Sequence, residues 1–260
     1  MTDASLRLAV TIGLLSLFAT WEWLGPARPS QVSLVRLARH GALSLLGSVV
    51  SRLVLAGGLA SVASFVQLFD FGLVNWRQLT GPWVWVGCIL ILDFAVWGQH
   101  VLSHKIPFFW RLHRLHHSDV VMDVTTALRF HPFEIIASLI FKASIVALLG
   151  APPALVFAFE LTLGAGAMFT HANIALPKAL DSTLRLLFVT PAMHLIHHNP
   201  NPVATNSNYG FSFSFWDRLF GTYRADAPLP ALPSGLDIGL EDWRGQQDQT
   251  LKAMVMNPFA

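Results

Sequence analysis

Histidines gather at three places in this 260-residue chain, with spacings that suit metal binding. Eight of the eleven histidines form the clusters His100-x3-His104, His113-x2-His116-His117 and His194-x2-His197-His198. Residues three or four apart share one face of a helix, so each cluster can aim two or three imidazoles at one point. Neutral imidazole is the commonest side-chain metal ligand and suits iron, zinc and copper. The clusters therefore predict a multi-histidine metal centre.

The composition indicates that this centre is attached to a membrane. The chain is 53% hydrophobic and only 12% charged, with a mean hydropathy of +0.53, far from the usual soluble balance. A net charge of +2 without a basic stripe argues against nucleic-acid binding. The single cysteine, Cys88, rules out intrachain disulfides, iron–sulfur clusters and cysteine-rich zinc sites. Leu6–Leu24 lacks a convincing charged start and cleavage site, so we expect a membrane span there rather than a signal peptide.

Four or five segments meet the requirement of about 20 largely apolar residues for a membrane helix. They are Leu6–Leu24, Ala42–Gln67, Pro82–His100, Phe133–Gly150 and Pro153–Phe169. The connection Gly150–Pro153 is so short that it predicts a helical hairpin. We predict an all-α fold, an integral membrane helical bundle of four to five spans with a cytosolic, histidine-rich metal-binding cap.

The orientation follows from the basic residues of the connections. Ala27–His40 carries three arginines and Lys105–Arg129 carries four basic residues, whereas Leu68–Gly81 is nearly neutral. The positive-inside rule therefore places the two basic connections in the cytoplasm. The same choice puts the three histidine clusters on the cytoplasmic side, so two separate signals agree.

The histidine clusters and the segments around them resemble the eight-histidine signature of the fatty acid hydroxylase/sterol desaturase superfamily, membrane enzymes with a non-haem di-iron centre. The similar segments are Phe109–His113, Thr126–Glu134, His171–Ile174, Thr190–His194, Asn208–Gly210 and Trp216–Tyr223. The resemblance runs from about Asp93 to Tyr223. Val101 and Leu195 depart from it, because family members often carry arginine there.

The resemblance implies a domain order, a ligand set and a reaction. It divides the chain into N-terminal transmembrane helices (1–81), a hydroxylase-like catalytic core (82–223) and an irregular C-terminal tail (224–260). Two iron ions, for which zinc can substitute in recombinant protein, would act with O2 and an external electron donor (a ferredoxin, cytochrome or reductase) on an unactivated C–H bond of a lipid. The implied metal ligands are His100, His104, His113, His116, His117, His171, His194, His197 and His198. The implied supporting residues of catalysis are His131, Asn173 and Asn208.

Other polar residues near the clusters and within the spans give further expectations. No Glu-x-x-His pair occurs, which argues against a carboxylate-bridged di-iron bundle. Acceptors that could orient the rings include Asp119, Asp123, Asn206 and Asp217, whereas His40 belongs to no motif. Lys142 and Glu160 are equally far from the hairpin turn and should pair. Asp93 could pair with Arg52 or line a substrate cavity.

Two other functions remain open from the residues alone: a metal transporter, and a membrane scaffold that holds a structural zinc. Transporters place polar ligands near mid-membrane, whereas these histidines collect at one surface. The substrate could be a fatty acyl, sterol-like, ether or carotenoid lipid, and the product could be hydroxylated or desaturated. The C-terminal residues 256–260 carry no retrieval signal of the KDEL type, which favours a bacterial inner membrane.

Overall fold

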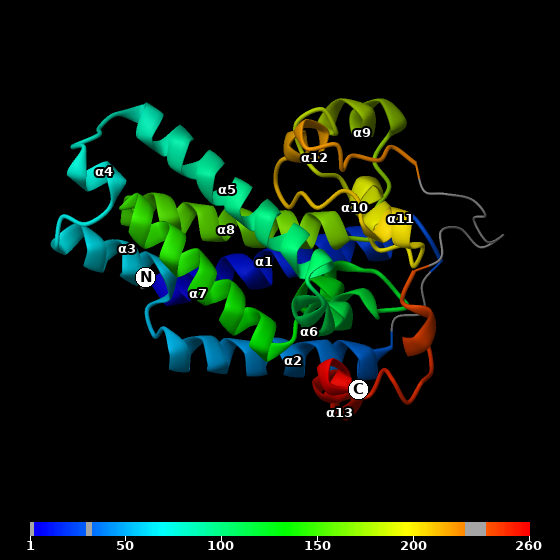
Figure 1. Cartoon of the computed structure of the whole chain (residues 1–260). Helices are drawn as coiled ribbons and strands as arrows, with labels where there is room; N and C mark the ends of the chain where they lie inside the picture. Colours follow the sequence, from blue (N-terminus) through cyan, green and yellow to red (C-terminus); the bar gives the residue numbers. More distant parts are fainter. Residues whose placement is uncertain (1–2, 30–32, 227–237) are drawn as a thin grey trace.

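A computed structural model describes residues 3–29, 33–226 and 238–260, and its regular elements are helices. Five long helices run side by side along the long axis of the molecule (Figure 1). They are α1 (Asp3–Leu24), α2 (Leu34–Val54), α5 (Pro82–Lys105), α7 (Pro132–Leu149) and α8 (Pro153–His171). Within the described residues, five candidate membrane spans are long and apolar enough to cross a bilayer. The predicted all-α membrane bundle is therefore confirmed.

The second predicted span, Ala42–Gln67, is wrong as a single helix. Here α2 ends at Val54, and a separate helix α3 (Gly58–Leu68) begins after a break. Gly58 has φ +68°, a left-handed conformation that glycine adopts without the clash of a side chain. The Gly57-Gly58 pair signalled this break in the sequence. As a result α3 turns to pack against α7 and α8 at the end of the bundle away from the histidine clusters.

The predicted helical hairpin at Gly150–Pro153 is present. Gly150 ends α7 with φ +64°, and Pro153 opens α8 at its first turn, where a missing N–H costs nothing. The chain before α4 (Leu73–Trp76) closes tightly on this turn. A Cβ atom at Gly72 (φ +95°) would lie 2.3 Å from the Gly150 nitrogen, so the contact requires glycine.

Acidic residues inside the spans form an ion pair and a hydrogen bond that were not predicted from the sequence. Glu160 on α8 pairs with Arg7 of α1 at 2.7 Å, and Lys142 lies near enough to Glu160 for charge attraction but forms no direct ion pair with it, so the predicted Lys142–Glu160 ion pair is wrong. Equal depth in a hairpin does not determine how each helix is rotated about its axis. Asp93 has no ion pair with Arg52 either, and its carboxylate accepts a hydrogen bond from the Trp216 indole at 2.9 Å.

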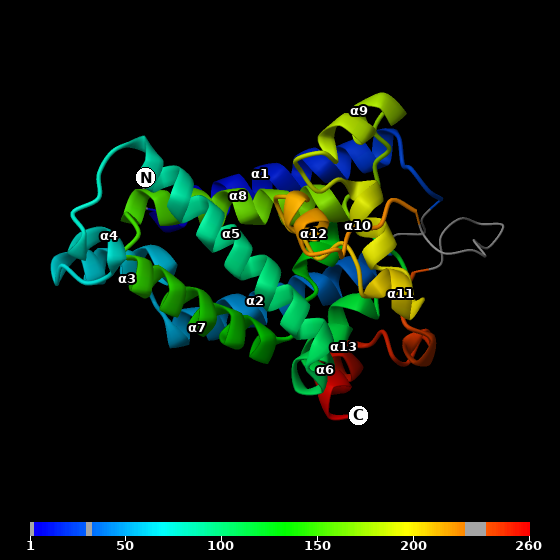
Figure 2. The same ribbon diagram turned by 45° about the horizontal axis from the view of Figure 1, so that its top comes forward.

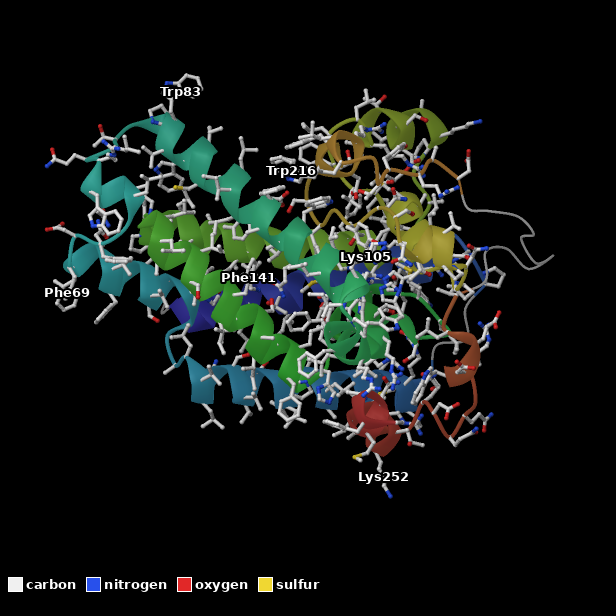
Figure 3. The ribbon with its side chains drawn as sticks, viewed as in Figure 1. Phe69, Trp83, Lys105, Phe141, Trp216 and Lys252 are labelled. Carbon is white, nitrogen blue, oxygen red and sulfur yellow. The ribbon has the colours of Figure 1, made fainter. Side chains whose placement is uncertain are left out.

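Short helices form a cap over one end of the bundle (Figure 2). They are α6 (Pro107–His117), η1 (Val124–Leu128), α9 (Lys178–Leu184), α10 (Pro191–His197), α11 (Pro202–Thr205), α12 (Phe215–Leu219), η2 (Glu241–Trp243), α13 (Leu251–Met256) and η3 (Asn257–Phe259). Lys105 marks this end of the bundle, and Trp83 and Phe69 lie at the other end (Figure 3).

The C-terminal tail is more ordered than the predicted irregular segment. Met254 of α13 is buried with Leu43 and Leu115, and the Arg114 guanidinium donates to Asn257 Oδ1 at 3.0 Å. The tail therefore clamps α6 against α2. Residues 227–237 of the predicted tail lie outside the described residues, and the division of the chain at residues 81 and 223 stays a prediction.

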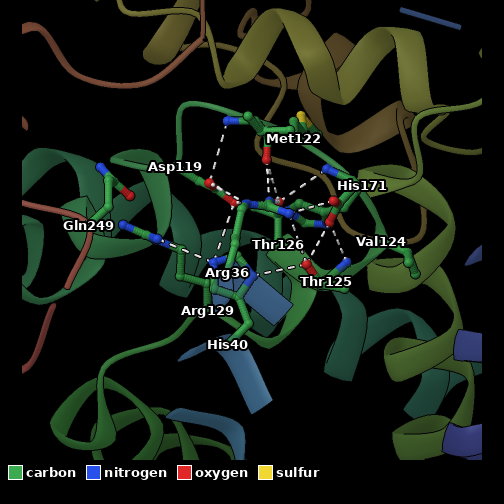
Figure 4. A network of polar contacts seen from close by, with 12 residues as sticks. Arg36, His40, Asp119, Met122, Val124, Thr125, Thr126, Arg129, His171 and Gln249 are labelled. Carbon is green, nitrogen blue, oxygen red and sulfur yellow. Dashed lines mark hydrogen bonds and ion pairs between the residues drawn. The ribbon is translucent and has the colours of Figure 1, made fainter. Parts of the chain in front are cut away.

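Arg36, a partly buried arginine, ties α2 to the segment between α6 and η1 (Figure 4). The Arg36 guanidinium pairs with Asp119 at 2.6 Å and with Asp123 at 2.5 Å, and it also donates to the Val121 carbonyl. Burial alone would raise the pKa of Asp119, but Arg36 and Arg129 hold that pKa below its ordinary value. The carboxylate is therefore charged in the folded protein, and its charge depends on these arginines.

We expect the Arg36→Met substitution to destabilise the protein strongly. It leaves the buried Asp123 without its cation and the buried Asp119 with only Arg129, a loss of about 3–5 kcal/mol, so the melting temperature should fall by ~10 °C. Thermal unfolding of the detergent-solubilised protein, followed by tryptophan fluorescence, measures the change. Arg52→Met on the exposed side of the same helix is the control. Equal melting temperatures for the two variants would contradict the role of the network.

Candidate metal centre

The nine predicted ligands come together in two groups at the cap end of the bundle. Within each group, the candidate ligand atoms lie within 4.8 Å of one another. The first group is His100, His104, His113, His117 and His197. The second group is His116, His171, His194 and His198. The rings of His117 and His198 stack across the boundary with centroids 4.4 Å apart, so the two groups are adjacent.

The two x2-His-His motifs distribute their rings between the groups through helical geometry. On α6, His113 and His117 are four residues apart and face the first group, whereas His116 faces the second. On α10 the arrangement is reversed, because His194 and the C-cap His198 face the second group. Each short helix thus contributes to two sites from one motif.

Three rings of the first group are held through their Nδ1 atoms. His100 donates to the Tyr209 carbonyl at 2.7 Å, and His197 donates to the Ser207 carbonyl at 2.7 Å. His113 contacts the Glu134 carboxylate at 2.6 Å. A metal-binding histidine commonly donates its other ring N–H to such an acceptor, which sets the tautomer and the ring orientation.

This tautomer leaves Nε2 lone pairs facing one another. His100 Nε2 lies 3.1 Å from the Nε2 atoms of both His113 and His197. Because a neutral imidazole carries one proton and His100 and His197 place it on Nδ1, neither of their facing Nε2 atoms can donate. Lone pairs this close repel one another unless a cation lies between them. Two nitrogens bound at about 2.1 Å to one metal have a similar separation, so the residues fit a metal ion.

In the second group, too, three Nε2 atoms lie close together, but fewer of the rings form hydrogen bonds through Nδ1. His171 donates from Nδ1 to the Ala167 carbonyl at 2.6 Å, and its Nε2 atom lies 3.0 Å from that of His116 and 3.1 Å from that of His194. In the described part of the chain, the Nδ1 atoms of His116, His194 and His198 are buried without a partner. Packing orients at least one of these rings, because Phe130 stacks on His116 with centroids 4.4 Å apart.

Burial keeps the cap histidines neutral. It holds the pKa of His116, His117, His194 and His198 well below the ordinary value, and the neighbouring imidazoles lower each pKa further. Burial also lowers the pKa of His197 to about 3. Neutral imidazole is the form that binds metals. The rings are therefore available as ligands at physiological pH.

The three predicted supporting residues contact the protein backbone near the groups. His131 accepts from the Phe133 N–H and contacts the Val255 carbonyl at 3.1 Å, which joins α7 to the C-terminal tail. Asn173 donates to the Arg28 carbonyl at 2.9 Å. Asn208 donates to the Met193 carbonyl at 3.2 Å. These bonds hold segments that carry histidines, and a part for the three residues in catalysis stays a prediction.

One carboxylate near the clusters contacts a histidine ring directly, and another acts on a ring through the backbone. Asp217 accepts from the Tyr209 and Gly210 N–H groups at 2.8 Å each, so it fixes the carbonyl that orients His100. Glu134 contacts a ring directly, and our sequence reasoning did not assign it a role. Its position in the first turn of an apolar helix was the available signal. His40 contacts Thr125 at 2.9 Å and lies outside both groups.

The sequence is similar to several known lipid-modifying enzymes. The model of the family described as "Fatty acid hydroxylase" matches residues 85–222, just over half of the chain. The chain is 29% identical to alkylglycerol monooxygenase of Caenorhabditis elegans, covering 70% of this chain and 35% of that protein. It is 31% identical to ornithine lipid hydroxylase OlsE of Rhizobium tropici (66% and 49% covered), and 28% identical to cholesterol 25-hydroxylase of Mus musculus (55% and 47%).

The matches therefore span about half or less of the length of these curated relatives. No solved structure matches the chain.

We expect the Glu134→Ala substitution to weaken metal binding about 10- to 100-fold, because His113 loses the acceptor that orients it. Glu134→Gln, which keeps an acceptor oxygen, should lie between this variant and the wild type. Iron retained during titration with a chelator, measured by elemental mass spectrometry, reports the affinity. Ser138→Ala, one turn further along α7, serves as the control. Unchanged retention in Glu134→Ala would show that the carboxylate does not support the metal.

Proposed function

This chain belongs to the fatty acid hydroxylase family, and on that premise we propose that it is a membrane-bound non-haem di-iron oxygenase that hydroxylates a lipid. The observation that carries the proposal is the set of facing Nε2 atoms in two adjacent, buried histidine groups. The relatives support the substrate class, because their names describe action on alkylglycerols, ornithine lipids and cholesterol.

One iron would be held by each histidine group, with His100, His113 and His197 at the centre of the first and His171 at the centre of the second. When bound, the irons would supply the O2-dependent oxidation of an unactivated C–H bond, with electrons from a ferredoxin, cytochrome or reductase. The protein keeps the rings neutral by burial and aims them through carbonyl and carboxylate acceptors. In this arrangement the histidines alone would bind the metals, so no carboxylate bridge between the metals is required.

Apolar side chains connect the first group with the interior of the bundle. Phe211 contacts the His100 ring with centroids 4.9 Å apart, and it also packs against the core formed by residues such as Leu92 and Leu155. The packed apolar core of the bundle therefore extends to the rings. Such surroundings exclude water from the rings.

We place the metal end of the bundle toward the cytoplasm, in a bacterial inner membrane. Arg36 from the first basic connection pairs with Asp119 from the second, so the two connections lie at the same end as the histidines. This arrangement supports the positive-inside orientation. A metal transporter is disfavoured, because its ligands would be expected near mid-membrane along a pathway.

Lipid mass spectrometry with 18O2 tests the reaction. Cells that express the wild type should contain a lipid that gains one labelled oxygen, and cells that express a His116→Ala, His117→Ala double variant should lack it. A Gln246→Ala, Lys252→Ala variant, changed at exposed positions of the tail, controls for double substitution. Loss of two hydrogens without label would indicate desaturation instead. Identical lipids in all three strains, with electrons supplied, would contradict oxygenase activity.

A further inference from the structure

A cavity of about 360 Å³ lies beside the second histidine group, between the end of α1, α9 and α10. Two of its lining residues, Ala172 and Leu195, directly follow His171 and His194 in the chain. Most of the other lining residues are apolar, but Arg28 and Lys178 add two cationic side chains. An apolar cavity with a few charged groups is typical of a site for a small amphipathic ligand.

Arg28 has an unused donor. Its Nη2 atom donates to the Met122 carbonyl at 3.2 Å, whereas its Nη1 atom is buried and has no partner in the described part of the chain. A buried donor without an acceptor is costly. Arg28 lines the cavity, and a rotation of its guanidinium would bring this donor to an anionic ligand there, because the guanidinium fork matches carboxylate and phosphate oxygens.

The acidic residues nearby are already engaged. Asp181 lines the cavity and pairs with Arg185 at 2.6 Å. Glu22 lies near Arg28, but one of its oxygens accepts from the Val124 N–H at 2.7 Å and the Asn173 N–H at 2.6 Å. Lys178 is exposed and forms no ion pair among the described residues. The charged side chains that line the cavity itself, Arg28, Lys178 and Asp181, therefore carry a net positive charge.

The cavity lies at the level of the membrane surface. Trp21 and Trp23, near the end of α1, are 41% and 81% exposed, and exposed tryptophans at the end of a span mark the head-group level of the bilayer. Arg28 follows a few residues later, and the Pro26–Ile174 bridge holds this segment against the chain that leaves His171. The cations are thus presented where lipid head groups lie.

We propose that this cavity binds the anionic head group, phosphate or carboxylate, of an amphipathic lipid and thereby positions the substrate beside the second histidine group. The inference rests on the proposed function, because it assigns a substrate class to that reaction. Arg28 and Lys178 would bind the head group through charge and hydrogen bonds. The apolar lining, including Leu195, would contact the first carbons of the lipid.

The test compares amphiphiles with and without an anionic head group, and a free anion without an apolar chain. Binding of dioctanoyl phosphatidic acid, dioctanoylglycerol, octanoate and inorganic phosphate to the detergent-solubilised protein is measured by thermal stabilisation. We expect the two anionic amphiphiles to stabilise the wild type, and dioctanoylglycerol and phosphate to have little effect. Arg28→Gln and Lys178→Gln should each weaken phosphatidic acid binding about tenfold, whereas Arg77→Gln at the far end of the bundle should not. Lys178 is exposed, so its variant should fold even if Arg28→Gln does not.

Three results would overturn the inference. The first is equal binding of phosphatidic acid to Lys178→Gln and wild type. The second is equal stabilisation by dioctanoylglycerol, which would indicate apolar binding alone. The third is stabilisation by inorganic phosphate as strong as by the lipid, which would indicate a site for a free anion.

Activity separates failure of this site from failure of the proposed function. If the wild type labels a lipid with 18O but neither variant changes anionic lipid binding, the head-group site is wrong and the hydroxylase stands. If binding depends on Lys178 but no lipid gains oxygen in the wild type, the proposed function is wrong, and with it the assignment of this lipid as substrate.

Discussion

The structure depends on holding neutral imidazoles with their lone pairs facing one another in a buried space. His100 and His197 each place a proton on Nδ1 for a fixed acceptor, and the Nε2 atom of His100 lies 3.1 Å from those of His113 and His197. Such an arrangement is unfavourable unless a cation is bound between the rings. The bundle and the cap must therefore be rigid enough to keep the rings converged, and much of the polar bonding in the cap serves this purpose.

Two sets of buried aspartates provide that rigidity. Asp119 and Asp123 bind Arg36 and fix the segment that follows the histidines of α6. On the opposite side, α5 and α12 exchange hydrogen bonds, since Trp97 donates to Asp217 at 3.1 Å and Trp216 donates to Asp93 at 2.9 Å. Asp217 also binds the Tyr209 amide, so the same carboxylate links the span, α12 and the carbonyl that orients His100.

The expectations that failed were those that needed the rotation or exact path of a helix. The hairpin turn places Lys142 and Glu160 at equal depth, but the packing of α1 beside α8 brings Arg7 to Glu160 first. The Gly57-Gly58 pair interrupts an apolar run that hydropathy alone reads as continuous. Residues 251–256 are too short to form a stable isolated helix, and they become helical where Met254 packs against Leu43 and Leu115.

The sequence by itself determined the helical membrane class, the hairpin and the eight clustered histidines, because apolar length and close histidine spacing are local properties of the chain, whereas His171 was implied by the family resemblance alone. Only the tertiary structure decided which ring joins which group and which acceptor aims each ring. Glu134 and the Tyr209 carbonyl meet His113 and His100 from 21 and 109 residues away. Such contacts depend on how helices pack and rotate, which is set by many weak interactions together rather than by any local pattern.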